Sequence, residues 1–107
     1  MSFKVFTTTE FQREFKRLFK KHKSLKADLQ LLVTSLENDP SQGTPIGQDC
    51  YKIRLAITST SKGKSGGARV ITYVKVADEF LYLLSIYAKS EKDSLTEKEL
   101  KKLLKSL

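Results

Sequence analysis

The stretch of this sequence that most constrains the fold runs from Tyr51 to Val76, where two segments of alternating pattern flank a glycine-rich connection. In the first segment, apolar side chains alternate with Lys52 and Arg54, which is the period of a β-strand with one packed and one polar face. The second segment, from Ala68 onward, is a β-branched run in which every second residue again shares a face. The stretch holds six basic residues and no acidic one, so the two predicted antiparallel strands present a cationic surface.

The periods of the apolar residues outside this stretch predict two further strands and three helices. Strands are expected at residues 3–7 and 80–89, and the second of these is apolar on both faces, as a central strand is. Residues 38–50 hold both prolines and two of the five glycines, which predicts a loop. Helices are expected where leucine and phenylalanine recur every three or four positions, at about residues 9–21, 25–37 and 96–107.

The resulting order, βααβββα, predicts an α+β fold in a single domain of residues 1–107. The first two helices are expected to pack as a hairpin on one face of a twisted, mostly antiparallel sheet. The candidate helix caps are Thr8 or Thr9, then Ser24, and then Ser94 or Thr96, with Thr96 and Glu99 as a possible capping box. Asp78 and Glu79 are expected to form a tight turn between the last two strands. The other face of the sheet is then partly open, which makes it the candidate binding surface.

The composition limits the kinds of partner and the kinds of chemistry. A net charge of +8 and a pI near 9.6 suit nucleic acid, an acidic protein or an anionic membrane surface. The single cysteine excludes an internal disulfide, and the single histidine excludes both a histidine acid–base pair and a multi-histidine metal site. No metal or other cofactor is expected. A polar start and the lack of an apolar run of about 18 residues predict a cytoplasmic protein that does not enter the membrane.

Four basic residues lie at or near the ends of the predicted strands: Lys52, Arg54, Arg69 and Lys89. A single Lys or Arg usually does no more than solvate a half-exposed sheet. Four cations held together repel one another unless an anion relieves the repulsion, so the set predicts a phosphate-binding site. Tyr73 shares a face with Arg69 and is a candidate to stack on a nucleotide base.

The glycine-rich connection contains the run Gly63–Ser65 but does not match a nucleotide-binding P-loop. That motif requires an earlier glycine where this chain has Thr58, and it leads into a helix rather than a strand. We therefore expect a hairpin tip whose Lys62 and Lys64 contact a nucleic-acid backbone through charge alone.

Other groups that often carry chemistry lack partners in the sequence. His22 lies in a run of lysines, which indicates a solvated, structural role. Lys52 is close enough to lower the pKa of the Cys50 thiol, but thiol catalysis also needs a histidine base, and none lies nearby. Acidic residues lie at turns and helix ends, where they cap and solubilise.

The first predicted helix has a strongly basic polar side. Two interpretations of this side stay open, namely a solvated helix face or a second docking surface for an RNA backbone or an acidic partner. The residues concerned are Arg13, Lys16, Arg17, Lys20 and Lys21.

Three segments carry a resemblance to a known family: YKIRLA, SGGARVITY and LLSIYAKSEKDSLTEKELKKLL. With the order βααβββα, they resemble the RelE/ParE superfamily of bacterial toxins over nearly the whole chain. The stretches KGKSGGARVITY and YAKSEKDSLTEKE are most similar to its HigB-type branch. The resemblance implies a cytosolic toxin of a type II toxin–antitoxin system that cleaves mRNA on the ribosome. It also implies a cognate antitoxin, from which we expect an acidic amphipathic segment laid over the basic sheet or beside the C-terminal helix.

The resemblance implies roles in a metal-free cleavage in which a ribose 2′-hydroxyl attacks the adjacent phosphate. Lys52 and Arg54 correspond to a basic pair that serves as base and proton relay, and Lys52 is the better base because arginine stays charged. Arg69 and Lys89 are expected to stabilise the charge of the phosphorane. Contacts with RNA are expected from Lys62, Lys64, Tyr73, Tyr87 and Lys92.

One departure from the family pattern concerns the proton donor. Where RelE proper has a tyrosine, this chain has Leu95, so Tyr87 or Glu91 becomes the candidate that protonates the leaving 5′-oxygen. Two alternatives to an mRNA nuclease therefore stay open. One is a ParE-type poison of DNA gyrase, and the other is a non-catalytic member of the fold that binds RNA or an antitoxin.

Overall fold

Strand β5 (Phe80–Ala88) is central to the sheet, as its apolar character on both faces predicts. The computed structural model describes residues 2–60, 66–92 and 94–107. It places β5 between β1 (Lys4–Thr7), which runs parallel to it, and β4 (Ala68–Lys75), which runs antiparallel. The turn from β4 into β5 lies at Val76–Asp78 and ends on Glu79, whose φ of 55° reverses the chain as predicted.

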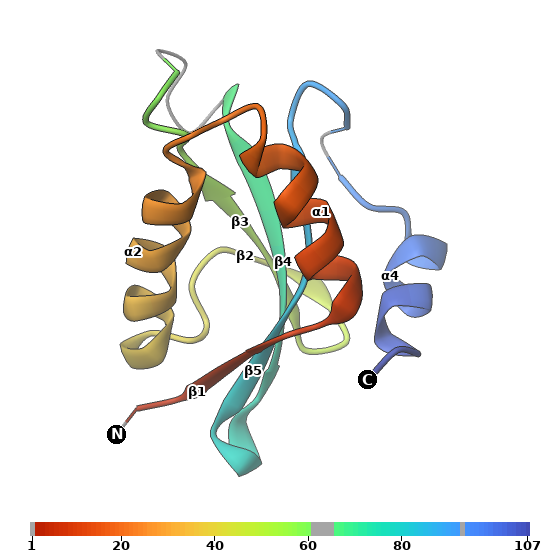
Figure 1. The fold of residues 1–107 in the computed structure, drawn as a ribbon. Helices are drawn as coiled ribbons and strands as arrows, with labels where there is room; N and C mark the ends of the chain where they lie inside the picture. Colours follow the sequence, from red (N-terminus) through yellow and green to blue (C-terminus); the bar gives the residue numbers. More distant parts are fainter. Residues whose placement is uncertain (1, 61–65, 93) are drawn as a thin grey trace.

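Two further strands complete the sheet, in the order β1-β5-β4-β3-β2 (Figure 1). β3 (Cys50–Leu55) pairs antiparallel with β4, and β2 (Thr44–Gly47) pairs antiparallel with β3. β2 corrects the expectation that residues 38–50 form only a loop. The loop was predicted partly because of Pro45. However, β2 is an edge strand, where a proline is tolerated because its missing N–H group is not needed for pairing.

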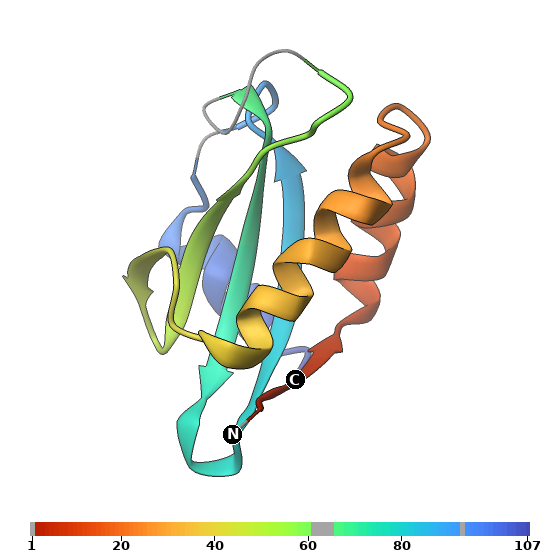
Figure 2. The same cartoon turned by 90° about the vertical axis from the view of Figure 1, so that its left-hand side faces the viewer.

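Helices α1 (Thr9–Phe19) and α2 (Leu25–Asn38) form the expected hairpin and cover one face of the sheet (Figure 2). Thr8 caps α1, because its hydroxyl oxygen accepts a backbone N–H of the first turn. Ser24 precedes α2, but its hydroxyl donates to Asp28 instead of capping the helix. The apolar stripes of both helices face the sheet.

The main core lies between these two helices and the sheet. Alternate residues of β3 and β4 point into it, as the sequence predicts, and β5 contributes Leu81, Leu83 and Ile86, with a register shift against β4 at Ile71/Thr72. Its buried members are Phe11, Leu18, Leu25, Leu32, Leu36, Ile53, Leu55, Ile57, Ala68, Val70, Val74, Leu81, Leu83 and Ile86.

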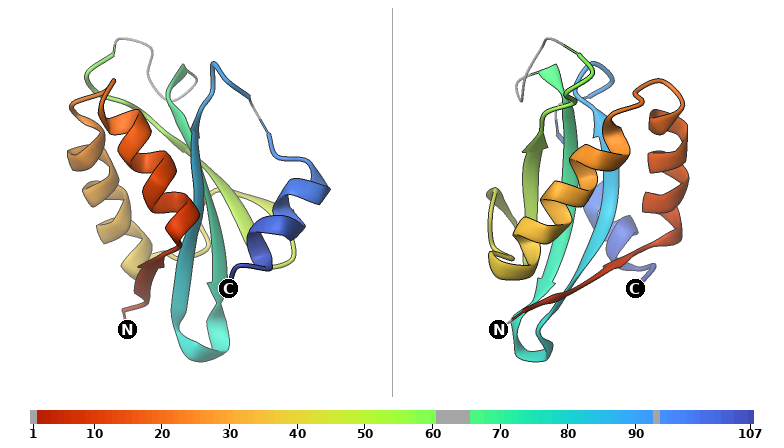
Figure 3. Two further views of the ribbon diagram at one scale, coloured as in Figure 1. Left: turned by 45° about the vertical axis from the view of Figure 1, so that its right-hand side comes forward. Right: turned by 60° about the vertical axis from the view of Figure 1, so that its left-hand side comes forward.

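Helix α4 (Glu97–Leu104) lies on the opposite face of the sheet (Figure 3). Thr96 and Glu99 form the predicted capping box at its start. Its leucines need an apolar surface, and they cover Ile71 and Tyr87, so less of this face is open than the sequence indicates. Neither α4 nor any other helix of the described chain is long and apolar enough to cross a membrane.

Candidate functional site

The sheet gathers the four basic residues of the sequence prediction at one end. Arg54, near the end of β3, lies directly opposite Arg69 at the start of β4. Lys89 follows the last residue of β5, and its backbone N–H donates to the Gly67 carbonyl at 2.9 Å, just before β4 begins. Lys52 is two residues from Arg54 on the same side of β3. Residues that are far apart in the sequence thus form one cationic region.

Arg69 is the fixed member of this set. Its side chain is buried, with 1% of its surface exposed, and one guanidinium nitrogen donates to the Ala68 carbonyl at 3.1 Å. Its cross-strand partner is Tyr87, which is 2% exposed. Arg54 and Lys89, in contrast, are exposed. The region therefore combines one buried cation with exposed cations at the surface.

Lys52 connects the sheet to the segment that leads into α4. It is half-buried, and its Nζ donates to the Ser94 hydroxyl at 2.9 Å. A cavity of about 300 Å³ lies beside this contact, lined by Lys52, Ser94, Leu95 and α4. Leu95 is half-buried and packs on the apolar cluster beneath α4. This position therefore serves packing in the present chain.

The charged residues after β5 are engaged with one another and with α1. Lys92 forms an ion pair with Glu99 at 3.1 Å and lies 5.0 Å above the centre of the Tyr87 ring. Glu91 pairs with Arg17 of α1 at 3.1 Å. The hydrogen bond from Arg17 holds the pKa of Glu91 below its usual range, so the carboxylate stays ionised at neutral pH. An ionised carboxylate cannot donate a proton, which disfavours Glu91 as the acid.

The two tyrosines expected to contact RNA lie in different places. Tyr87 is buried beside Arg69, so its ring offers no open face to a base in this conformation. Tyr73 is half-buried opposite Tyr82, four residues along β4 from Arg69, which is a separation of about 13 Å. Tyr73 and the cationic region thus form two separate sites on the sheet. Lys62 and Lys64 lie outside the described residues.

Cys50 and His22 take structural positions. The Cys50 thiol is buried under α4, and burial together with the nearby Asp49 carboxylate raises its pKa to about 11. This corrects the expectation that Lys52 lowers that pKa, because loss of solvation outweighs a neighbouring cation. His22 is half-buried in the turn between α1 and α2, where its backbone bonds to both helices.

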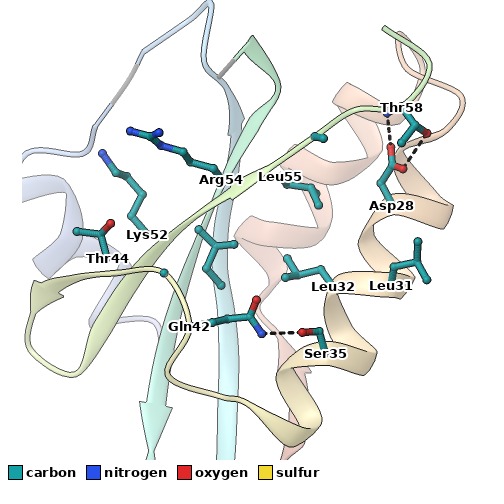
Figure 4. A pocket seen from close by; sticks show the side chains of 13 residues that line it. Asp28, Leu31, Leu32, Ser35, Gln42, Thr44, Lys52, Arg54, Leu55 and Thr58 are labelled. Carbon is teal, nitrogen blue, oxygen red and sulfur yellow. Dashed lines mark hydrogen bonds between the residues drawn. The ribbon is translucent and has the colours of Figure 1, made fainter. Parts of the chain in front are cut away.

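Two carboxylates have connecting roles that the sequence interpretation missed. Asp28 of α2 accepts hydrogen bonds from the backbone N–H of Thr58 at 3.0 Å and from its hydroxyl at 2.9 Å (Figure 4). It also accepts from Ser24 at 2.8 Å, so it fastens the chain after β3 to the start of α2. In the sequence, only Ser24, four residues before Asp28, indicates that this aspartate forms a local side-chain hydrogen bond.

The second such carboxylate, Glu14, lies in the middle of α1. It accepts the Ser85 hydroxyl at 2.8 Å and the Ile86 N–H at 3.4 Å, on the edge of β5 that β1 leaves uncovered. Burial raises the pKa of its carboxyl above the usual range, although the bond from Ser85 opposes this rise. No pattern in the sequence singles out Glu14, because its partners lie on a distant strand.

Comparison with known proteins agrees with this architecture. The sequence model of the family described as "RelE toxin of RelE / RelB toxin-antitoxin system" matches residues 3–106. Among solved structures, the chain is similar to a double arginine-to-alanine mutant of the E. coli toxin RelE in its free state. The two chains share 19% sequence identity with a TM-score of 0.67, over 95% of this chain and 98% of the other. The fold is therefore that of RelE, and because the family match spans nearly its whole length, this chain belongs to the RelE toxin family of toxin–antitoxin systems.

Proposed function

We propose that this chain is a toxin that cleaves mRNA on the ribosome, without a metal ion, and that its cationic region is the catalytic site. One observation carries the proposal: Arg54 lies directly opposite the buried Arg69, with Lys52 and Lys89 nearby. A phosphate bound there meets cations from three strands of one rigid sheet. Such preorganised charge is the usual means by which enzymes stabilise a charged transition state.

The reaction requires a base, a stabilised phosphorane and a proton donor. The ribose 2′-oxygen bonds to phosphorus while the bond to the 5′-oxygen breaks, which leaves a 2′,3′-cyclic phosphate and a 5′-hydroxyl. Lys52 takes the proton of the 2′-hydroxyl, since arginine keeps its protons at neutral pH. Arg54 and Lys89, which are exposed, hold the phosphorane oxygens, and the buried Arg69 stabilises the same charge from beneath them. Lys52 then relays its proton to the leaving oxygen, because Glu91 stays ionised and Tyr87 is buried.

The position of Lys52 supports this assignment. Its contact with the Ser94 hydroxyl fixes the amino group beside Arg54 on the exposed side of β3. The side chain can leave this contact with little effect on the core, because it lies at the surface of the sheet. RNA contacts from Lys92, Lys62, Lys64 and Tyr73 extend the site along the RNA chain.

The test is a cell-free translation reaction in which new mRNA 5′ ends are mapped by primer extension, with and without ribosomes. The wild-type chain is expected to produce new ends only with ribosomes, and Lys52→Ala and Arg54→Ala to reduce cleavage by about a hundredfold or more. Both residues are at least partly exposed, so these variants keep the fold, whereas removal of the buried Arg69 endangers it. Lys75→Ala is the matched control, because Lys75 is an exposed lysine at the far end of β4.

Cleavage by Lys52→Ala and Arg54→Ala at the wild-type rate would contradict the proposed site. If the folded wild-type chain makes no new ends at all, the nuclease proposal fails, and a gyrase supercoiling assay then tests the gyrase-poison alternative.

A further inference from the structure

The outer edge of β5 changes its partner halfway along the strand. β1 pairs with Phe80–Leu83, and within the described residues no strand pairs with this edge farther along. A side chain of α1 takes over there, because the Glu14 carboxylate accepts hydrogen bonds from Ser85 and Ile86. Glu14 therefore supplies part of what a neighbouring strand would otherwise supply to the edge of the sheet.

β5 also contains a β-bulge just beyond the point where its pairing with β1 ends. Ile71 of β4 lies opposite Ser85, but the next residue, Thr72, lies opposite Leu83. Leu84 is therefore an extra residue in β5. An extra residue reverses the faces to which the following side chains point.

The bulge decides where Tyr87 points. Strict alternation after Leu83 would send Tyr87 into the main core, but with one extra residue Ile86 takes the core position and Tyr87 faces α4. On that face Tyr87 lies opposite Arg69 of β4, and the Lys92 amino group lies 5.0 Å from the centre of its ring. The bulge thus brings Tyr87 to the cationic region.

Glu14 contacts the two residues that directly follow the bulge. One oxygen of its carboxylate accepts both the Ser85 hydroxyl at 2.8 Å and the Ile86 backbone N–H at 3.4 Å. One turn farther along α1, Arg17 pairs with Glu91 beyond the end of β5, but this pair is exposed and contributes little. Loss of the Glu14 oxygen would leave two donors at a half-buried position without this acceptor, which favours a shift of the strand.

We propose that Glu14 is a positioning residue for the cleavage site: by holding the bulge of β5, it keeps Tyr87 and the adjacent Arg69 in the arrangement that the reaction requires. Glu14 itself does not touch the reacting phosphate. Its role in cleavage rests on the proposed function, whereas its hold on the bulge does not. Because both bonds end on one oxygen, the amide oxygen of a glutamine can replace it, so the position requires an acceptor and not a charge.

The first measurement is the single-turnover rate of mRNA cleavage at saturating ribosomes, expressed per folded chain, together with the Kd for the ribosome. Glu14→Ala is expected to lower the rate by about tenfold or more with an unchanged Kd, because misplaced groups act on the chemical step. Glu14→Gln is expected to cleave within about twofold of the wild type, because it keeps the acceptor. Glu10→Ala is the matched control, since it removes the same charge one turn earlier on α1, where Glu10 pairs with Arg13.

The second measurement uses NMR and no RNA. In the wild type, the Tyr87 ring is expected to show nuclear Overhauser contacts with the Arg69 side chain and to shift the resonances of the Lys92 side chain. Glu14→Ala is expected to lose both signals, whereas Glu14→Gln keeps them. Ser85→Ala removes one of the two bonds and is expected to weaken both signals, so it decides the question if Glu14→Ala does not fold.

Four outcomes would overturn the proposal. They are cleavage by Glu14→Ala at the wild-type rate, an equal loss in Glu10→Ala, an equal loss in Glu14→Gln, and survival of both Tyr87 signals in Glu14→Ala. If the wild type does not cleave mRNA but its Tyr87 signals depend on Glu14, the proposed nuclease fails, and with it the role in cleavage, whereas the hold on the bulge is confirmed.

Discussion

The two faces of the sheet differ in how they are covered and in what they carry. Within the described residues, the face beneath α1 and α2 has fourteen buried residues in one apolar cluster, against five in the cluster beneath α4. The α4 face also holds the buried Arg69 and the half-buried Lys52. Burial of a cation costs free energy, so this face contributes less to stability and carries the candidate site.

This difference means that the residues that stabilise the fold and those of the candidate site lie on opposite faces of one sheet. Alternation along each strand sends one set of side chains to each face, so a single strand serves both purposes. On β4, Val70 and Val74 join the main core, while Arg69 and Ile71 point to the opposite face of the sheet.

The largest effect is expected from Leu36→Ala on the α1–α2 face. Leu36 has no exposed surface and belongs to the main core, so its loss should lower the free energy of unfolding by about 2–5 kcal/mol. Urea denaturation followed by circular dichroism measures this change. A loss no greater than that of the α4-face variant Leu100→Ala would break the comparison of the two faces.

A smaller and more local effect is expected from Leu100→Ala on the α4 face. Leu100 is 4% exposed, but α4 has only eight residues and covers the smaller cluster. We expect a loss at the lower end of the same range, about 2 kcal/mol, with faster hydrogen exchange in α4 and unchanged exchange in β4 and β5. Faster exchange through the whole sheet would show instead that the two faces unfold as one unit.

The third effect is confined to alkaline pH and concerns the Cys50 thiol beneath α4. Its pKa is about 11 in the folded chain, against a usual 9.0. Between these values the folded state binds more protons than the unfolded state, so the free energy of unfolding falls as pH rises from 9 to 11. Denaturation across this window, with Cys50→Ala as the control that lacks the thiol, measures the difference. Equal pH dependence of the two proteins would show that the α4 cluster does not exclude water from Cys50.

Most of the fold is predictable from the sequence, because each element carries a local signal. The periods of apolar residues indicate the strands β1, β3, β4 and β5 and the three helices, and Thr96 with Glu99 indicates the start of α4. β2 is not predictable in this way. Its short run, with Pro45 and a neighbouring glycine, resembles a loop until β3 is there to pair with it.

The candidate site is predictable in its residue types but not in its geometry. The sequence indicates Lys52, Arg54, Arg69 and Lys89 as a cationic set, and their roles in cleavage stay predictions. The contacts that define the site join residues from distant parts of the chain. Glu91 pairs with Arg17, Lys52 contacts Ser94, and Tyr87 is buried. Local sequence patterns do not predict contacts between residues so far apart in the chain.

By itself the sequence determined the alternation of apolar and basic residues along the strands, and hence the existence of one packed and one cationic side. It also determined, through a single histidine and a single cysteine, which kinds of catalysis this chain lacks. Only the tertiary structure decided that Arg69 is buried, that α4 covers Tyr87, and that β2 pairs with β3. The physical reason is that periodicity is set by neighbours in the chain, whereas burial and pairing depend on which distant surfaces meet.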